Sequence, residues 1–212
     1  MAQNFLILAS ASPRRAELLT QIGVSFTIRP ADIDERLVEG EGPAAYVLRL
    51  AGTKARAVAK YAGGRHSGAR HSGNGSFVLG ADTIVVVDEE VLGKPANTLD
   101  AAAMLTKLAG REHQVITGVA LAAAPQGNEL KSFVVCTKVR FRQLTEEEIS
   151  AYVRSGEPMD KAGAYGIQGL GGVLVESIEG NYSTVVGLPL AETFELLSAF
   201  DIDTGLSRQN SV

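Results

Sequence analysis

Short apolar runs separated by longer amphipathic stretches characterise the first half of the chain. Residues 5–9 and 77–82 are largely apolar, and residues 24–28 alternate between apolar and polar side chains. Both patterns predict β-strands. Residues 14–21 and 44–61 instead place apolar side chains three or four positions apart, which predicts amphipathic helices. Strands and helices are therefore expected to alternate in this half.

The second half of the chain mixes the same two patterns. Further strands are predicted at residues 83–87, 114–123, 131–142 and 173–178, and further helices at residues 99–108 and 190–198 and from Thr145 onward. Thr145 and Glu148 form a capping-box pattern at the start of that helix. Two neighbouring strands in direct succession indicate a hairpin. We therefore predict an α/β fold with a mixed central β-sheet flanked by helices, rather than a purely parallel sheet.

Residues 63–76 interrupt this alternation because they are rich in Gly, His, Ser and Arg. They contain His66 and His71, so metal binding is one interpretation. The histidines lack a compact ligand spacing, however, and a flexible, solvated loop insertion is favoured. Residues 1–203 are predicted to form a single domain, and residues 204–212 a polar C-terminal tail.

The composition is that of an ordinary globular protein of 212 residues with a formal net charge of -4. This charge disfavours a broad nucleic-acid-binding surface, although it is compatible with a local cationic pocket for a small anion. The single cysteine, Cys136, excludes an intramolecular disulfide and is expected to be a small buried thiol on a strand. We find no signal-peptide pattern and no apolar segment of about 20 residues, so we expect a cytoplasmic protein without a membrane partner.

Hydroxyl and guanidinium side chains cluster where the first predicted strand meets the first helix, in residues 10–15 (SASPRR). Ser12 suits the N-cap and Pro13 the first helical position. Arg14 and Arg15 in the first turn oppose the helix dipole, and a bound phosphate would reverse that penalty. An exposed basic turn is the alternative interpretation, and this segment alone does not decide between them.

Asp82 ends the apolar run of residues 77–82, although burying an unpaired carboxylate is costly. A structural aspartate that caps a turn is the alternative to a functional one. Lys94 follows a hairpin turn predicted at residues 88–90, which would direct a cation back toward Asp82. Lys54 lies on the preceding amphipathic helix and is a second candidate cation.

Three further acids, Asp32, Asp34 and Glu35, follow the second predicted strand. Carboxylate oxygens of this kind suit Mg²⁺ or Mn²⁺. Such a cluster is also typical of a solvated loop, which is the more common case.

Glycines recur at every third position in residues 163–169, and such spacing lets the backbone approach a ligand closely. Gln168 in this stretch can donate and accept hydrogen bonds, which suits reading the edge of a base. A plain connecting loop is the alternative. The chain contains no Gly-x-x-x-x-Gly-Lys-Ser/Thr loop, no Gly-x-Ser-x-Gly elbow and no Cys/His zinc pattern, which disfavours the corresponding enzyme classes.

From near its start to about Phe200 the chain resembles the Maf family of nucleoside triphosphate pyrophosphatases. Five segments carry this resemblance in order: residues 8–15 (LASASPRR), 80–83 (GADT), 93–95 (GKP), 160–169 (DKAGAYGIQG) and 185–190 (VVGLPL). The branch of the family that hydrolyses dTTP and UTP has arginine, threonine and glutamine at its specificity positions. Arg14, Thr83 and Gln168 match these three positions.

The resemblance implies a mixed α/β fold of two lobes around a cleft, like that of the inosine triphosphatases (Maf/Ham1), and a homodimer. It implies that Asp82 is the proton acceptor. It further implies phosphate-binding or metal-site roles for Ser10, Arg15, Lys54, Lys94 and Glu35, with Glu35 and Asp82 helping to hold Mg²⁺ or Mn²⁺.

The expected function is therefore hydrolysis of dTTP and UTP to the monophosphate and pyrophosphate, with a small-molecule nucleotide as the partner. One alternative is a housecleaning pyrophosphatase for damaged or modified nucleotides. Another is a regulatory nucleotide-binding protein of septum formation and cell-division arrest, with weak or no catalysis. The presence of Asp82, Glu35 and Lys54 argues against the regulatory protein, since a binding module requires no base.

Overall fold

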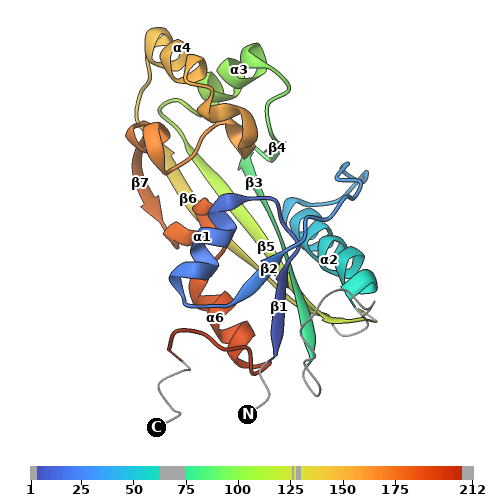
Figure 1. Cartoon of the computed structure of the whole chain (residues 1–212). Coiled ribbons are helices and arrows are strands. Elements are labelled where there is room, and N and C mark those ends of the chain that lie inside the picture. Colours follow the sequence, from blue (N-terminus) through green and yellow to red (C-terminus); the bar gives the residue numbers. More distant parts are fainter. Residues whose placement is uncertain (1–3, 63–74, 126, 128–129, 207–212) are drawn as a thin grey trace. The chain divides into compact units, whose positions relative to one another are not determined.

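The computed structural model describes residues 4–62, 75–125, 127 and 130–206 (Figure 1). Within them a 7-stranded sheet has the order β2-β1-β3-β5-β6-β7, and β4 pairs with β3. The strands are β1 (Phe5–Leu8), β2 (Phe26–Ile28), β3 (Ser76–Val87), β4 (Glu90–Leu92), β5 (Glu112–Ala124), β6 (Leu130–Phe141) and β7 (Val175–Glu179). β2 and β3 are parallel to β1, whereas β4 is antiparallel to β3 and β7 to β6. The predicted mixed sheet is confirmed.

Helices account for most of the remaining described chain. They are α1 (Pro13–Gln21), α2 (Pro43–Ala62), α3 (Thr98–Leu108), α4 (Glu146–Arg154), α5 (Tyr182–Val186) and α6 (Leu190–Ser198), with 3₁₀ turns η1 (Glu157–Asp160), η2 (Ala162–Ala164) and η3 (Gly169–Leu174). Every predicted helix is present, and the glycine-rich stretch forms the 3₁₀ turns. The helix α5 was outside the predicted set because it is too short to show a helical period.

By its internal contacts the chain divides into two compact units. The first unit comprises Met1–Asp82, Gly118–Val134 and Gly187–Val212, and the second unit comprises Thr83–Thr117 and Val135–Val186. Strands β3, β5 and β6 each contribute residues to both units. The loop insertion predicted at residues 63–76 lies outside the described residues apart from its last two positions, and His66 and His71 lie outside them as well.

In the first unit, α2 packs closely against one face of β1 and β3. Small side chains make this possible, among them Ala51 and Ala55 on the helix. Gly80 on β3 has no Cβ, and a Cβ at this position would collide with the backbone of both alanines. Because side chains alternate along a strand, Val78, Gly80 and Asp82 share the face that α2 covers. The backbone of α2 is thereby held close to Asp82.

In the second unit, α3 and α4 lie side by side and bury apolar side chains against the sheet (Figure 1). The predicted capping box opens α4: the Thr145 hydroxyl accepts from the Glu148 N–H at 3.2 Å, and a Glu148 carboxylate oxygen accepts from the Thr145 N–H at 2.9 Å. Asp88 and Glu89 have positive φ angles of 49° and 64°, as a two-residue hairpin turn between β3 and β4 requires. Both predictions are confirmed.

Three local predictions need correction or extension. The segments predicted as strands at residues 77–82 and 83–87 form one continuous strand, β3, so the Asp82 carboxylate lies within a buried strand. Cys136 is exposed rather than buried, because alternation along β6 places it on the face opposite the buried Thr137. Thr204 is buried, and the Gly205 N–H donates to the Ile22 carbonyl at 2.7 Å, so packed chain extends beyond residue 203.

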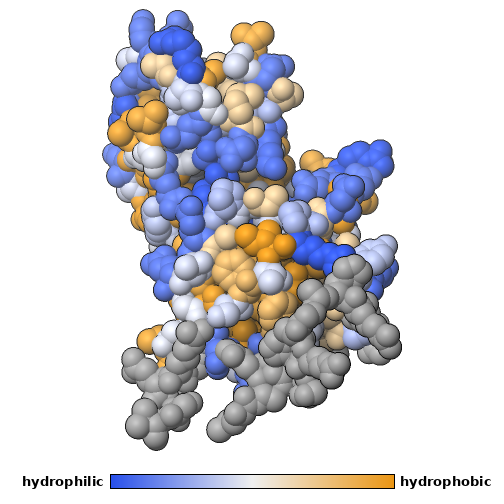
Figure 2. All heavy atoms as spheres, viewed as in Figure 1, coloured by the Kyte–Doolittle hydropathy of each residue, from blue (hydrophilic) through white to orange (hydrophobic). Residues whose placement is uncertain are grey.

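The molecular surface includes an apolar area at one edge of the sheet. Figure 2 shows hydrophobic residues gathered over β1 and β2, where the edge residue Ile28 is 55% exposed. Within the part of the chain that the structure describes, no helix has both the length and the apolar character needed to cross a membrane.

His113, at the start of β5, is buried in an aromatic cluster of the second unit. Its Nε2 atom lies 2.7 Å from the Tyr165 hydroxyl, and its ring contacts Phe141 edge-on. Burial lowers the pKa of His113 from 6.5 to about 4, since surroundings of low polarity disfavour the imidazolium form. The side chain is therefore a neutral structural element near pH 7.

Acid is expected to destabilise the protein through His113. Its folded-state pKa is below the unfolded value, so its contribution to stability is complete above pH 6.5 and is lost as the pH falls toward 4. The shift corresponds to ~3 kcal/mol of unfolding free energy over that window. Urea unfolding at pH 7 and pH 4.5 measures the loss, which should be smaller in His113→Phe. An equal loss in both proteins would contradict this assignment.

Candidate active site

Two carboxylates converge on one ammonium group in the first unit. The Lys54 Nζ atom lies 2.7 Å from Asp82 Oδ1 and 2.7 Å from Glu35 Oε1. Lys54 and Asp82 are each 8% exposed, whereas the Glu35 side chain is half exposed. Because both oxygens contact the same nitrogen, Asp82 Oδ1 and Glu35 Oε1 are separated by at most twice 2.7 Å. Three of the residues selected from the sequence thus meet at one point.

The packing of α2 explains how Lys54 reaches Asp82. Gly80 allows the helix backbone to approach β3 next to Ala55, and Lys54 precedes that residue. Asp82 lies two positions beyond Gly80 on the same face of the strand. A buried carboxylate without a partner would be strongly destabilising, and Lys54 supplies the partner.

Arg15 is fixed by two acceptors at the start of α1. Its Nε donates to the Gly187 carbonyl at 2.9 Å, and its Nη1 donates to the Ser10 hydroxyl at 3.1 Å. Ser10 Oγ also accepts from the Ser12 backbone N–H at 3.2 Å. Ser12 and Pro13 occupy the predicted N-cap and first helical positions, but the Ser12 side chain makes no capping hydrogen bond. Ser10 therefore ties the arginine to the end of β1.

Arg15 also interacts electrostatically with two acidic residues of the first unit, Asp82 and Glu35. Burial lowers the pKa of its guanidinium, and the negative charges of Asp82 and Glu35 oppose that shift. An arginine side chain nevertheless stays protonated in proteins. Arg15 is therefore a permanent positive charge within the field of the two acids at Lys54.

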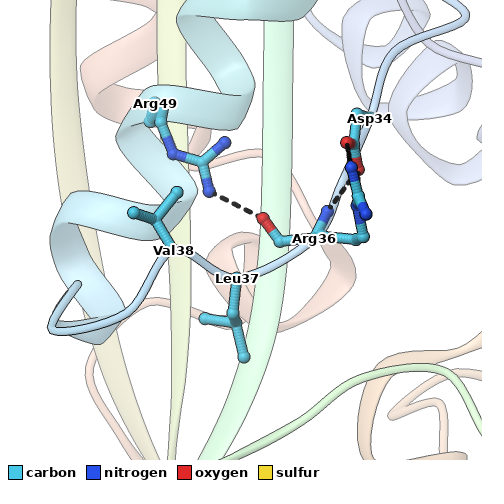
Figure 3. Close-up of a pocket in the computed structure, with 5 residues that line it drawn as sticks. All are labelled: Asp34, Arg36, Leu37, Val38 and Arg49. Atoms are coloured by element: carbon cyan, nitrogen blue, oxygen red, sulfur yellow. Dashed lines mark hydrogen bonds and ion pairs between the residues drawn. The ribbon is translucent and has the colours of Figure 1, made fainter.

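Tyr46 and Arg49 on α2 fix the loop that carries Glu35. The Tyr46 hydroxyl donates to the Glu35 carbonyl at 2.7 Å, and Arg49 Nη2 donates to the Arg36 carbonyl at 3.1 Å. Arg49 also forms a two-pronged ion pair with Glu41. Figure 3 shows Arg49 pointing from α2 toward the loop, where it lines a pocket with Asp34, Arg36, Leu37 and Val38.

Sequence reasoning missed both anchoring residues. Tyr46 and Arg49 stand three positions apart on one face of a helix, and that spacing is the only signal they give. The groups that they hold next to Glu35 are backbone carbonyls, which no side-chain pattern reveals. Asp34, which was grouped with Glu35 by sequence, instead pairs with Arg36.

Thr83 is the first residue of the second unit and follows Asp82 directly on β3. Its hydroxyl lies 2.9 Å from the Thr117 hydroxyl, which donates to the Thr184 carbonyl at 2.9 Å. Thr117 and Thr184 are fully buried, whereas Thr83 is half-buried. Thr117, itself held by the Thr184 carbonyl, thus keeps the Thr83 hydroxyl in a defined orientation.

The remaining candidates lie in both units. Arg14 is half-buried on α1 in the first unit, and Lys94 and Gln168 are exposed in the second. Gln168 directly precedes η3. The Gly163 N–H donates to the Gly93 carbonyl at 3.0 Å, so the segment that carries Lys94 contacts the glycine-rich stretch.

Asp82 and Glu35 are the residues of the first unit that could together hold a divalent cation. Among the residues with described positions, no group of three or more His, Cys, Asp or Glu side chains forms a complete metal cage. Mg²⁺, however, usually binds one or two carboxylates and takes its other ligands from water and substrate phosphates. Asp82 and Glu35 converge closely enough to provide that carboxylate pair.

Comparison with known proteins places these features in a family. Residues 5–200 match the family described as Maf-like protein. The chain belongs to the Maf family. The match extends from β1 to the end of α6 and therefore includes every candidate residue of both units.

Three relatives of high identity share one description. The dTTP/UTP pyrophosphatase of Myxococcus xanthus is 54% identical, covering 92% of this chain and 92% of the relative. Those of Pseudoalteromonas atlantica and Moorella thermoacetica are 51% and 52% identical, each covering 93% of this chain and 97% and 96% of the relative. All three span nearly the whole chain.

Two solved structures similar to this chain have much lower sequence identity to it. A HAM1 protein from Coxiella burnetii is 15% identical with a TM-score of 0.48, covering 93% of this chain and 99% of that chain. A nucleoside-triphosphatase, dITP/XTP pyrophosphatase, from Mycobacterium abscessus is 16% identical with a TM-score of 0.42, covering 93% and 94%.

Proposed function

We propose that this Maf-family chain hydrolyses dTTP and UTP to the nucleoside monophosphate and pyrophosphate. The observation that carries the proposal is the convergence of Asp82 and Glu35 on Lys54 within the field of Arg15. Relatives that are more than half identical over nearly the full chain are described as dTTP/UTP pyrophosphatases, which supports the choice of substrates.

The reaction requires a water molecule to attack the α-phosphorus of the nucleotide. A new bond forms between the water oxygen and phosphorus, and the bridging bond between the α- and β-phosphates breaks to release pyrophosphate. Asp82 accepts the proton that the water loses, as a general base. Lys54 donates a hydrogen bond to the Asp82 carboxylate and thereby fixes its orientation.

Cationic side chains stabilise the negative charge of the triphosphate. Arg15 suits this role because its orientation is fixed by Ser10 and Gly187 before substrate binds. We assign Lys54 and Lys94 to the phosphates as well. Asp82 and Glu35 would hold Mg²⁺ or Mn²⁺, and the bound cation would neutralise phosphate charge.

Base recognition is assigned to Arg14, Thr83 and Gln168. The Thr83 hydroxyl is oriented by Thr117, and Gln168 offers both a donor and an acceptor to the edge of a pyrimidine. A site that hydrogen-bonds a base edge rejects an analogue with the wrong donor and acceptor pattern, because buried polar groups would remain unpaired.

Product analysis with a nucleotide panel tests the proposed reaction. Purified protein with Mg²⁺ or Mn²⁺ should convert dTTP and UTP to monophosphate and pyrophosphate faster than CTP or 7-methyl-GTP. Release of orthophosphate would instead indicate stepwise removal of phosphates. Nucleotide binding without turnover at saturating Mn²⁺ would contradict the proposal and favour a binding protein.

Tyr46→Phe is expected to raise the Mn²⁺ concentration needed for half-maximal rate by about tenfold, because the hydroxyl that anchors the Glu35 backbone is removed. The rate at saturating metal should change little. Calorimetric titration with Mn²⁺ checks binding independently of activity. Tyr61→Phe is the matched control, since Tyr61 is on the same helix but 68% exposed. Equal metal dependence in all three proteins would contradict the anchoring role.

Assembly and location are separate parts of the proposal. We propose a homodimer, as the family resemblance implies, and size-exclusion chromatography with light scattering would test it. A cytoplasmic location is proposed because nucleoside triphosphates are the intended substrates. The net charge of -4 supports a small-molecule rather than a nucleic-acid partner.

A further inference from the structure

We infer that Glu157 and Tyr152 are positioning residues that clamp the backbone on both sides of Gln168 and thereby set the base preference of the enzyme. The inference rests on the proposed function, because it concerns how the assigned base-reading residue is held. Neither residue lies in the segment from Asp160 to Gly169 that carries the family resemblance. All the contacts involved lie within the second unit.

Two linked side chains hold the backbone before and after Gln168. Before it, the Gly166 N–H donates to the Tyr152 hydroxyl at 3.2 Å. After it, the N–H groups of Leu170 and Gly171 each donate to the Glu157 carboxylate at 3.0 Å.

The two side chains of the clamp also bind each other. The Tyr152 hydroxyl donates to Glu157 Oε1 at 2.8 Å, which makes the two groups one continuous support. Lys161 Nζ donates to the Glu157 carbonyl at 2.6 Å and so fixes the backbone of that residue. The two side chains come from α4 and η1, outside the segment from Gly166 to Gly171 that they hold.

The glycines explain why the loop depends on a clamp. Glycine loses more conformational freedom on ordering than any other residue, and this stretch is rich in it. Gly171 approaches Tyr152 so closely that a Cβ would lie 2.5 Å from its hydroxyl oxygen, and Gly169 has a φ of 69°. Without side chains of their own to pack, these residues obtain their order from the hydrogen bonds of Glu157 and Tyr152.

The charge of Glu157 strengthens this support. Burial alone would raise the pKa of the carboxyl, but hydrogen bonds from Gly171, Tyr152 and Leu170 outweigh burial and lower the pKa below its usual value. The group is therefore an ionised carboxylate with three donors. Such charge-assisted hydrogen bonds are roughly twice as strong as neutral ones.

Glu157→Gln is the direct test, because a carboxamide has one oxygen and a donating NH₂ where the carboxylate has two accepting oxygens. We expect the ratio of kcat/KM for UTP to that for CTP to fall about tenfold. Tyr152→Phe should change the ratio in the same direction. Glu179→Gln is the matched control, since its exposed carboxylate in the same unit pairs only weakly with Lys138 at 3.4 Å.

A double-variant cycle distinguishes positioning from general damage to the fold. If Glu157 acts through Gln168, Glu157→Gln should not change the UTP-to-CTP ratio further when Gln168→Ala is already present. An equal fall in both backgrounds would overturn the inference, as would an unchanged ratio in an active Glu157→Gln enzyme. Absence of turnover by the unaltered protein with any nucleotide would overturn the proposed function, and the inference with it.

Discussion

Asp82→Asn is expected to lower the turnover of dTTP and UTP by about a thousandfold, since the proposed proton acceptor is lost. Asparagine has nearly the same shape as aspartate, and Lys54 keeps its second partner, Glu35. The fold should therefore survive, with circular dichroism and a melting curve close to those of the unaltered protein. Pyrophosphate release measures the activity.

Asp201→Asn provides the control for this experiment. Asp201 is exposed in the same unit and has a φ of 51°, a conformation that asparagine adopts as readily as aspartate. The control should keep full activity. If Asp82→Asn also hydrolysed dTTP at the normal rate, Asp82 would not be the base.

Lys54→Met should remove activity and stability together. The change leaves the buried Asp82 carboxylate without the ammonium that neutralises it, and breaking a buried ion pair in this way costs ~3 kcal/mol of unfolding free energy. Activity is expected to fall about a hundredfold because the side chain also faces the phosphates in the proposed complex. Urea unfolding and pyrophosphate release measure the two effects.

The double variant Lys54→Met with Asp82→Asn separates these effects. Removing both charges should recover most of the lost stability, because a neutral pair no longer leaves an unpaired charge in the interior. The double variant should nevertheless remain inactive. A double variant as unstable as Lys54→Met would show that packing of the lysine stem, rather than its charge, stabilises the site.

Much of the fold could be predicted because helices and strands have different periods. The long amphipathic α2 and the capping box of α4 are strong local signals, and both are present. Cys136 shows the limit of this approach. Its strand was recognised, but an apolar run does not reveal which alternate residues face inward, and the structure places Cys136 outward.

The candidate site could be predicted in part. Asp82 attracts notice because an acid in an apolar run needs a partner, but Lys54 is 28 residues away and no local pattern joins them. Packing at Gly80 creates that pairing. Tyr46 and Glu157 could not be found at all, because they act on backbone groups whose positions depend on tertiary structure.

The pleat of β3 has a consequence for how this protein tolerates change. Asp82 and Thr83 are joined by one peptide bond, yet the alternation of the strand directs their side chains to opposite faces. A substitution at either position changes one side chain and leaves the direction of the other as it was. Insertion or deletion of a single residue upstream in the strand would reverse both at once, so the length of this segment should be far more constrained in functional variants than its composition.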